Sequence, residues 1–341
     1  MILSAIFGRS QSDLLAILVV SIATIAIITR QWKKLSLPTV PVSVNYHFTR
    51  ECNKTCGFCF HTEKSSFVES KQNAQRGLRL LKEAGMRKIN FAGGEPFLYP
   101  RFLGELCQYC KTVLHLESVS IITNGTKITP SWLQQYGEYV DVRVSCDSFN
   151  EQTNIEIGRG SGENVRKLFQ ISQWCRTYGI KFKLNTVVCK LNCQEDMAET
   201  VERLAPFRWK CFQVLLVEGE NDAADTELDV RKRNAKNLMI SDEEYEQFCS
   251  RHRHLKCFVP EPNNLMASSY LILDEYMRFL DKGPGYETAS PSILEVGVAK
   301  AMEFITWDAK SFRDRGGTYD WSKKVDDESC RGKNSGKELE W

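Results

Sequence analysis

Short apolar runs alternate with amphipathic segments along most of the chain. Six runs rich in β-branched and aromatic residues predict strands at 42–46, 88–91, 119–123, 140–145, 181–188 and 211–217. Apolar residues recur at helical spacing within 70–84 and 163–178, which predicts a helix in each segment. Gly85 and Gly179 follow these segments directly, and glycine at this position is typical of a helix end. Strand–helix repeats with right-handed crossovers predict an α/β fold, in which a parallel sheet curves into a partial (βα)6 barrel.

The pattern changes at both ends of the chain. Residues 14–29 are apolar and uncharged, and as a helix they would be about 24 Å long, short of the roughly 30 Å hydrocarbon core of a bilayer. Three basic residues between positions 30 and 34 would hold the following chain on the cytosolic side. We therefore expect a membrane-associating helix within residues 1–36, spanning the bilayer or lying on it, a barrel over 37–240, and a C-terminal extension over 241–341 that closes the substrate site.

Charge and cysteine content narrow the class of protein. The 341 residues include 45 Lys and Arg against 43 Asp and Glu, and this balance argues against a dedicated nucleic-acid-binding protein. The 13 cysteines are odd in number and irregular in spacing, which favours a reducing compartment over a disulfide-stapled secreted domain. Most are expected to be small buried side chains, among them Cys107 and Cys110 in a predicted helix.

Three cysteines follow the first predicted strand at close spacing. Cys52, Cys56 and Cys59 form a C-x3-C-x2-C sequence. Thiolates are the usual ligands of iron–sulfur clusters, and three ligands to a four-iron cluster leave one iron open to a small molecule. His61 stands two residues further on, so a structural Cys3His zinc site is an alternative.

A second motif, Gly93-Gly94-Glu95-Pro96, ends the second predicted strand. Glycines there would let the backbone approach a ligand closely. A glycine pair alone says little, but its position one strand–helix unit after the cysteines makes it informative.

Together the two motifs resemble the radical S-adenosylmethionine (SAM) superfamily, and the chain is similar to its antiviral nucleotide-dehydratase family. Matching segments are 45–50, 59–62, 82–86, 145–149, 157–160, 218–221, 269–276 and the terminal Trp341. The resemblance covers roughly residues 42–322, and it implies a [4Fe–4S] cluster on the three cysteines and SAM as cofactor.

The resemblance also implies a reaction. In this family the cluster reduces SAM, which gives methionine and a 5′-deoxyadenosyl radical, and the radical removes the 4′ hydrogen of CTP. Dehydration then yields 3′-deoxy-3′,4′-didehydro-CTP, an antiviral chain terminator, while the protein supplies position and electrostatics. The family further implies the cytosolic face of the endoplasmic reticulum membrane or lipid droplets as location, and docking of Trp341 onto the cytosolic iron–sulfur assembly machinery.

SAM-binding residues follow from matching to the family. They are the backbone of Gly93, Gly94 and Glu95, together with Asn124, Gly125, Ser145 and Arg159. All fall at or just beyond the carboxyl ends of predicted strands, where ligands collect in parallel βα folds. Arg159 could pair with the SAM carboxylate through two hydrogen bonds, and a surface ion pair is the alternative.

The predicted substrate pocket has a charge signature. Lys183 and Asn185 share one face of the fifth predicted strand, Arg208 and Lys210 share a face entering the sixth, and Lys88 opens the second. Faces of parallel strands are normally apolar, so inward charges need an anion, which a triphosphate supplies. Matching to the family supports these five residues as phosphate or ribose contacts. It also adds Asn45 and Tyr270.

Other functions stay open at this point. The enzyme could act on another nucleotide such as UTP or on a peptide, although only three widely separated cysteines follow Cys211, which argues against the auxiliary clusters of peptide-modifying enzymes. A membrane-anchored interaction protein with a structural metal site is a second alternative. No motif reads the base, so CTP rests on the resemblance.

Overall fold

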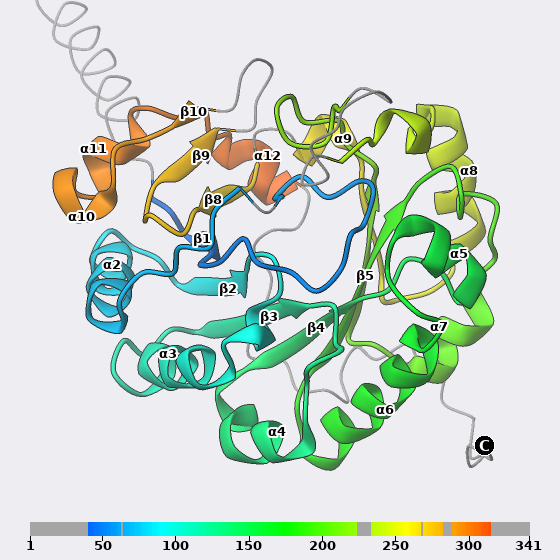
Figure 1. Ribbon diagram of the computed structural model, residues 1–341, viewed down its shortest axis with the longest axis horizontal. Coiled ribbons are helices and arrows are strands. Elements are labelled where there is room, and N and C mark those ends of the chain that lie inside the picture. The colour runs from blue at the N-terminus through cyan, green and yellow to red at the C-terminus, as the bar shows by residue number, and fades with distance from the viewer. Residues whose placement is uncertain (1–39, 63, 224–232, 267–268, 282–287, 315–341) are drawn as a thin grey trace, which may run out of the picture. The chain divides into compact units, whose positions relative to one another are not determined.

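The computed structural model describes residues 40–314, apart from 63, 224–232, 267–268 and 282–287 (Figure 1). The predicted N-terminal segment, 1–36, and the end of the chain with Trp341 therefore lie outside the described residues. Within the described ranges, no helix has the length and apolar character needed to cross a membrane.

One sheet organises the described residues. Its strands are β1 Ser43–His47, β2 Lys88–Ala92, β3 Ser118–Thr123, β4 Asp141–Ser145, β5 Phe182–Val188, β6 Arg208–Gln213, β7 Phe258–Glu261, β8 Leu271–Leu273, β9 Phe279–Asp281 and β10 Thr288–Ala289. The spatial order is β10-β9-β8-β1-β2-β3-β4-β5-β6-β7. Every neighbouring pair from β8 through β7 is parallel, whereas β9 and β10 continue the sheet with antiparallel pairing.

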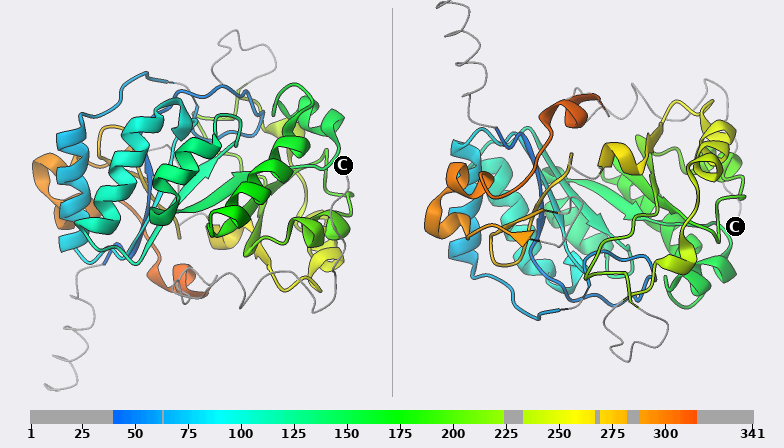
Figure 2. Two further views of the ribbon diagram at one scale, coloured as in Figure 1. Left: turned by 90° about the horizontal axis from the view of Figure 1, so that it is seen from below. Right: turned by 90° about the horizontal axis from the view of Figure 1, so that it is seen from above.

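Helices follow the parallel strands and cover the outer face of the curved sheet (Figure 1). The longer ones are α2 Lys71–Glu83, α3 Pro100–Thr112, α4 Pro130–Tyr136, α5 Glu151–Ile157, α6 Asn164–Thr177, α7 Ala198–Leu204 and α8 Asp242–His252. Shorter pieces are η2 Pro96–Leu98, η3 Gly137–Tyr139, η4 Lys236–Leu238, α9 Asn263–Met266, α10 Ile293–Val296, α11 Val298–Met302 and α12 Ala309–Asp314. Seen from below, α2, α3, α4 and α6 stand in a row along this face (Figure 2).

Local chemistry accounts for where these helices begin and end. Ser70 caps α2, because its hydroxyl accepts a hydrogen bond of 3.2 Å from the backbone N–H of Asn73. Gly85 and Gly179 follow α2 and α6 in left-handed conformations, with φ of 103° and 66°. The two helices predicted most clearly from the sequence are thus confirmed to within a residue at each end.

The predicted α/β alternation and parallel sheet are confirmed, with one boundary error. The sixth strand was predicted at 211–217 but spans Arg208–Gln213. Its sequence alternates, so that Trp209 and Cys211 are fully buried under helices while the intervening side chains face the other side. The apolar run 214–217 that suggested a strand instead continues past the sheet edge, where Leu215 and Val217 line a cavity.

Residues of the predicted C-terminal extension belong to the same sheet as the barrel. β8 pairs with β1 in parallel, and β7 pairs with β6. These two strands lie on either side of the barrel opening, so the extension contributes to both of its edges. Tyr270, immediately before β8, is thereby brought into the same cavity as Asn45 on β1.

Candidate active site

A cavity of about 300 Å³ opens at the carboxyl ends of the parallel strands. Its walls come from strand ends of β1 to β6, from the loop 48–62 that follows β1, and from residues around β8. Predicted site residues that line it are Asn45, Cys52, Cys56, Cys59, Gly93, Gly94, Asn124, Ser145, Arg159, Asn185 and Tyr270. The fold therefore brings predicted cofactor and substrate residues to one space, as expected for the carboxyl face of a parallel barrel.

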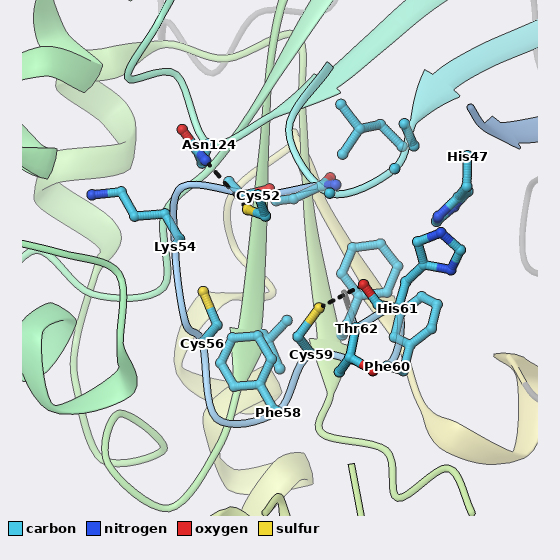
Figure 3. A pocket seen from close by; sticks show the side chains of 18 of the residues that line it. His47, Cys52, Lys54, Cys56, Phe58, Cys59, Phe60, His61, Thr62 and Asn124 are labelled. Carbon is cyan, nitrogen blue, oxygen red and sulfur yellow. Dashed lines mark hydrogen bonds between the residues drawn. The ribbon is translucent and has the colours of Figure 1, made fainter. Parts of the chain in front are cut away.

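The three cysteines surround one end of this cavity. Their side chains project from the loop 48–62 toward a common space (Figure 3). All three are free thiols, and burial raises the pKa of Cys52 to about 12 and that of Cys56 to about 11. Metal binding has to remove these protons, so loading of the site is expected to release protons and to depend on pH.

The loop 48–62 is held by a very close crossing over the Gly93–Gly94 turn. Gly94 donates its N–H to the carbonyl of Thr49 at 2.8 Å, and Glu95 donates its N–H to the carbonyl of Glu51 at 2.7 Å. A Cβ on Gly94 would lie 2.0 Å from the Glu51 oxygen. The glycines are thus required by the loop itself.

This geometry refines the predicted role of the motif. The N–H groups of Gly94 and Glu95 are used by the loop, so these two groups are not available to a ligand. Glu95 does not line the cavity: its fully buried carboxylate accepts from Thr123 Oγ1 at 2.6 Å and from the N–H of Asn124 at 2.7 Å. It braces the ends of β2 and β3.

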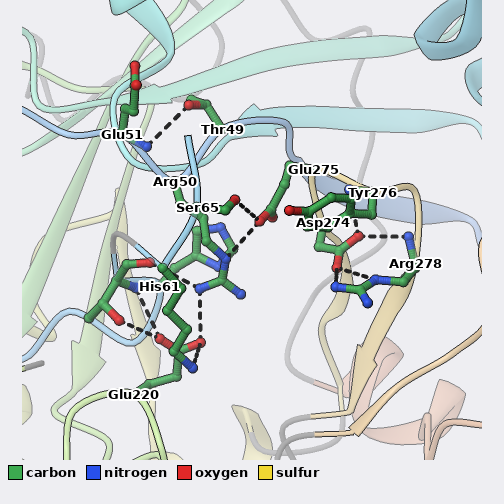
Figure 4. A network of polar contacts seen from close by, with 12 residues as sticks. Thr49, Arg50, Glu51, His61, Ser65, Glu220, Asp274, Glu275, Tyr276 and Arg278 are labelled. Atoms are coloured by element: carbon green, nitrogen blue, oxygen red, sulfur yellow. Dashed lines mark hydrogen bonds and ion pairs between the residues drawn. The ribbon is translucent and has the colours of Figure 1, made fainter. Parts of the chain in front are cut away.

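Both ends of the cysteine loop converge on one buried arginine (Figure 4). Arg50 Nη1 lies 3.1 Å from Glu220 Oε1 and donates to the carbonyl of Thr62 at 3.1 Å. Glu220 in turn accepts from the N–H and the hydroxyl of Thr62, at 3.1 and 2.8 Å. The residues that precede and follow the cysteines are therefore fixed to the same carboxylate.

A second carboxylate ties this arginine to the C-terminal part of the sheet. Arg50 Nε donates to Glu275 Oε1 at 3.1 Å, and Ser65 donates to the same oxygen at 2.7 Å. Glu275 follows β8 and is 1% exposed. A buried arginine with two carboxylates is costly to disrupt, because removal of one partner leaves an uncompensated charge.

The remaining predicted SAM residues divide into cavity-lining and structural ones. Asn124 and Ser145 line the cavity at the ends of β3 and β4, and so does Arg159, which follows α5. Arg159 donates through Nε to Asp147 at 2.5 Å, which leaves the far edge of the guanidinium for a ligand. Gly125 lies outside the cavity lining and serves the turn after β3 with a φ of 82°.

The predicted basic residues lie on the inner face of the sheet, below the cavity lining. Lys88, Lys183 and Lys210 are at most 7% exposed, and Arg208 is half-buried. Burial, with Lys183, Arg143 and Lys210 nearby, lowers the pKa of Lys88 well below its ordinary value. An anion bound among these cations would reverse that effect.

One part of the charge argument needs correction, because the protein supplies counter-ions of its own. Lys183 Nζ lies 2.5 Å from Asp141 Oδ2, and Lys210 is hydrogen-bonded to Glu261 and, at 3.1 Å, to the hydroxyl of Tyr270. The sequence does not reveal these acids, because each reaches its lysine from a neighbouring strand.

The sequence does not predict the pairing of several other residues around the site. Arg50, Glu220 and Glu275 lie in segments that resemble the family, but their pairing joins positions 170 and 225 residues apart. Asp147, which orients Arg159, stands two residues after Ser145 at the end of β4. Its position after a strand and within the family-like segment 145–149 is the signal that the sequence offers for it.

The geometry does not favour the zinc alternative. The ring of His61 packs edge-on against that of His47, with centroids 4.4 Å apart. Figure 3 shows this ring beside His47 and outside the space between the three sulfurs.

Comparison with known proteins agrees with the site. Residues 46–204 match the model of the radical SAM superfamily. A Danio rerio protein named S-adenosylmethionine-dependent nucleotide dehydratase RSAD2, also called viperin, is 54% identical over 290 residues, which are 84% of this chain and 79% of that protein. A Flammeovirga pacifica protein named S-adenosylmethionine-dependent nucleotide dehydratase is 36% identical over 290 residues, which are 82% of this chain and 96% of that protein.

The chain belongs to the S-adenosylmethionine-dependent nucleotide dehydratases. The predicted resemblance is thereby confirmed, and so are SAM and a [4Fe–4S] cluster as cofactors. Among solved structures, Streptococcus suis SuiB bound to S-adenosylmethionine has a TM-score of 0.61 at 16% identity, covering 84% of this chain and 70% of that one. At this identity the likeness confirms the fold.

The residues of this nucleotide dehydratase fit both cofactors. Three free thiols face one space for the cluster, and the positive charge of Arg159 acts against the burial that raises the pKa of Cys56. Asn124, Ser145 and Arg159 would hold the polar groups of SAM at the strand ends beside it. The cavity that they share with the cysteines has room for a small ligand.

Replacement of a cysteine tests the cluster ligands. Cys56→Ala should abolish both iron binding and SAM cleavage in the dehydratase, because the cluster loses one of three protein ligands. Cys107→Ala, at a fully buried position in α3, should keep both. The measurements are iron content and 5′-deoxyadenosine formation after anaerobic reconstitution, and 5′-deoxyadenosine from Cys56→Ala would disprove the assignment.

Gly94→Ala tests whether the close crossing positions the cysteines. The new Cβ must displace the Glu51 carbonyl, so the variant should lose most of its iron while far-ultraviolet circular dichroism stays native. Gly179→Ala is the matched control, because no heavy atom lies within 4 Å of its Cβ position. Its left-handed backbone costs about 1–2 kcal/mol of stability but should leave iron content unchanged. Equal iron in the two variants would contradict the proposed dependence.

Proposed function

We propose that this dehydratase acts on CTP and converts it to 3′-deoxy-3′,4′-didehydro-CTP. When bound, the cluster and SAM supply a 5′-deoxyadenosyl radical, which removes the 4′ hydrogen before water is lost from the 3′ position. The observation that carries the proposal is a cavity with three cysteines at one end and a buried cationic layer beneath it. In a nucleoside triphosphate the reacting ribose and the charged phosphates are likewise separate, so the ribose can face the cysteines while the phosphates lie among the cations.

The protein's own residues would bind and orient the nucleotide. Among the described residues, the inner layer contains the cations Lys88, Arg143, Lys183, Arg208 and Lys210 and the acids Asp141 and Glu261. Such a gathering of cations on one face favours an anionic ligand. Asn45, Asn185 and Tyr270 lie between this layer and the cysteines, where a ribose or base would be held.

The same cationic layer helps to discriminate between the alternative substrates. UTP would satisfy the cations equally well, so the base remains the part of the proposal that rests on the family. A neutral peptide would add no negative charge to this cationic layer, whereas a triphosphate would. SuiB, solved with its precursor peptide, shares the fold at 17% identity, and this likeness says nothing about substrate.

We further propose an antiviral role on the cytosolic face of the endoplasmic reticulum membrane or of lipid droplets, with cluster delivery through Trp341. Support comes from the apolar run 14–29 with its basic flank, from the terminal tryptophan, and from the family resemblance. These segments lie outside the described residues.

The substrate proposal predicts which nucleotide stimulates SAM cleavage. Formation of 5′-deoxyadenosine is measured with CTP, UTP, GTP and ATP in parallel, and CTP alone should stimulate it strongly. Lys183→Ala should raise the KM for CTP at least tenfold, since a hydrogen bond to a charged group contributes about 1.5–3 kcal/mol. Uncoupled SAM cleavage should persist.

Lys190→Ala, at an exposed position, is the control for this lysine and should leave the KM unchanged. Stimulation by UTP alone would replace CTP as substrate within the same chemistry. No stimulation by any nucleotide, with a reducible cluster present, would overturn the nucleotide proposal.

The location proposal predicts a separation of anchoring from catalysis. Removal of residues 1–36 should release the protein from membranes while turnover of CTP stays unchanged, because the active site is built from residues after 44. Fractionation of cells and assay of the reconstituted truncation measure the two properties. A soluble truncation without activity would contradict the separation.

A further inference from the structure

Three buried polar atoms at the base of the barrel lack a hydrogen-bond partner in the described part of the chain. They are Ser118 Oγ, Ser120 Oγ and Asn90 Oδ1. The three residues are at most 5% exposed. Buried polar groups are nearly always satisfied, so this gathering on two adjacent strands indicates a ligand or ordered water.

Strand register places these residues on the inner face, below the cavity. Asn45, which lines the cavity, is the Cα partner of Asn90, and Asn90 is the partner of Ser120. Ser118 is paired with Lys88 and opens β3. Ser120 lies two residues, about 7 Å, below Ile122, another lining residue. The serines therefore lie below the cavity, toward the amino ends of the strands and away from the cysteines.

A buried arginine faces the same region. Arg143 on β4 is 5% exposed and is the register partner of Ile122 on one side and Lys183 on the other. Over the described ranges, no acceptor lies within hydrogen-bond distance of its guanidinium and no carboxylate within ion-pair distance. A buried guanidinium without an anion is unfavourable, whereas Asp141, the nearest acid along the strand, is engaged by Lys183.

We propose that Ser118, Ser120 and Arg143 form the subsite for the terminal phosphate of the nucleotide. The inference rests on the proposed function, because it requires a nucleoside triphosphate whose ribose faces the cysteines. Two hydroxyl donors and a planar guanidinium match the oxygens of a phosphate. Water could satisfy the serines, but it would leave the arginine charge uncompensated. With the ribose facing the cysteines, the terminal phosphate would occupy the deepest position in the barrel.

The test uses full-length, anaerobically reconstituted protein with SAM bound, and titration calorimetry with CTP and CDP. Arg143→Gln should weaken CTP binding at least tenfold and CDP binding less than about threefold, because CDP lacks the phosphate that the arginine would contact. The double variant Ser118→Ala, Ser120→Ala should change the CTP-to-CDP ratio in the same direction. Arg87→Gln on the surface and Ser172→Ala in α6 are controls that should leave both affinities unchanged.

Thermal stability provides a readout that a structural arginine would not give. Without nucleotide, Arg143→Gln should melt at the wild-type temperature or above it, since an uncompensated buried charge is removed. Inorganic triphosphate should raise the melting temperature of wild type and much less that of the variant. A lower melting temperature together with an unchanged CTP-to-CDP ratio would overturn the inference and assign Arg143 to the fold.

The outcomes separate this inference from the proposed function. If wild type turns over CTP but the arginine and serine variants keep its CTP-to-CDP ratio, only water fills the subsite and the inference is wrong. If wild type binds no nucleoside triphosphate, the proposed function itself fails. Should Arg143→Gln not fold, the double serine variant decides by the same ratio.

Discussion

The position of the three cysteines depends on one close crossing of backbone over backbone. The loop that carries them passes the Gly93–Gly94 turn at a separation that no side chain at position 94 could share. Arg50, with Glu220 and Glu275, fixes both ends of the loop to distant parts of the sheet. A metal cluster needs its ligands preorganised. Here the close backbone contact fixes how far the loop lies from the Gly93–Gly94 turn, and the buried ion pairs fix where its two ends are held.

The inner face of the sheet follows a second constraint, since charge cannot be buried without compensation. Two lysines are compensated within the protein by Asp141 and Glu261. This keeps their ammonium groups in place before substrate arrives and limits the reorganisation that binding requires. The cost is stability, and among the described residues Arg143 is the inner-face cation for which we propose compensation by a ligand.

Much of this architecture could be predicted from the sequence, because local periodicity reports strands and helices directly. The cysteine motif can be recognised by its close spacing, and the inward lysines by the two-residue period of their strands. The sixth strand was misplaced because the apolar run 214–217 resembles a buried strand more than the alternating 208–213 does. Arg50–Glu275 and Lys210–Glu261 could not be foreseen, since each pair depends on which strands become neighbours, and single-sequence patterns carry no such information.

Pairing of β8 with β1 has a consequence for the order of biosynthesis. The cysteine loop emerges early from the ribosome, yet Glu275, which holds Arg50, is separated from it by 225 residues. Until that late segment has been synthesised and has docked against β1, the loop lacks one of its two carboxylate anchors. Insertion of the metal cluster is therefore a step for the finished polypeptide, and a cell short of iron would accumulate folded barrels whose thiols are still protonated.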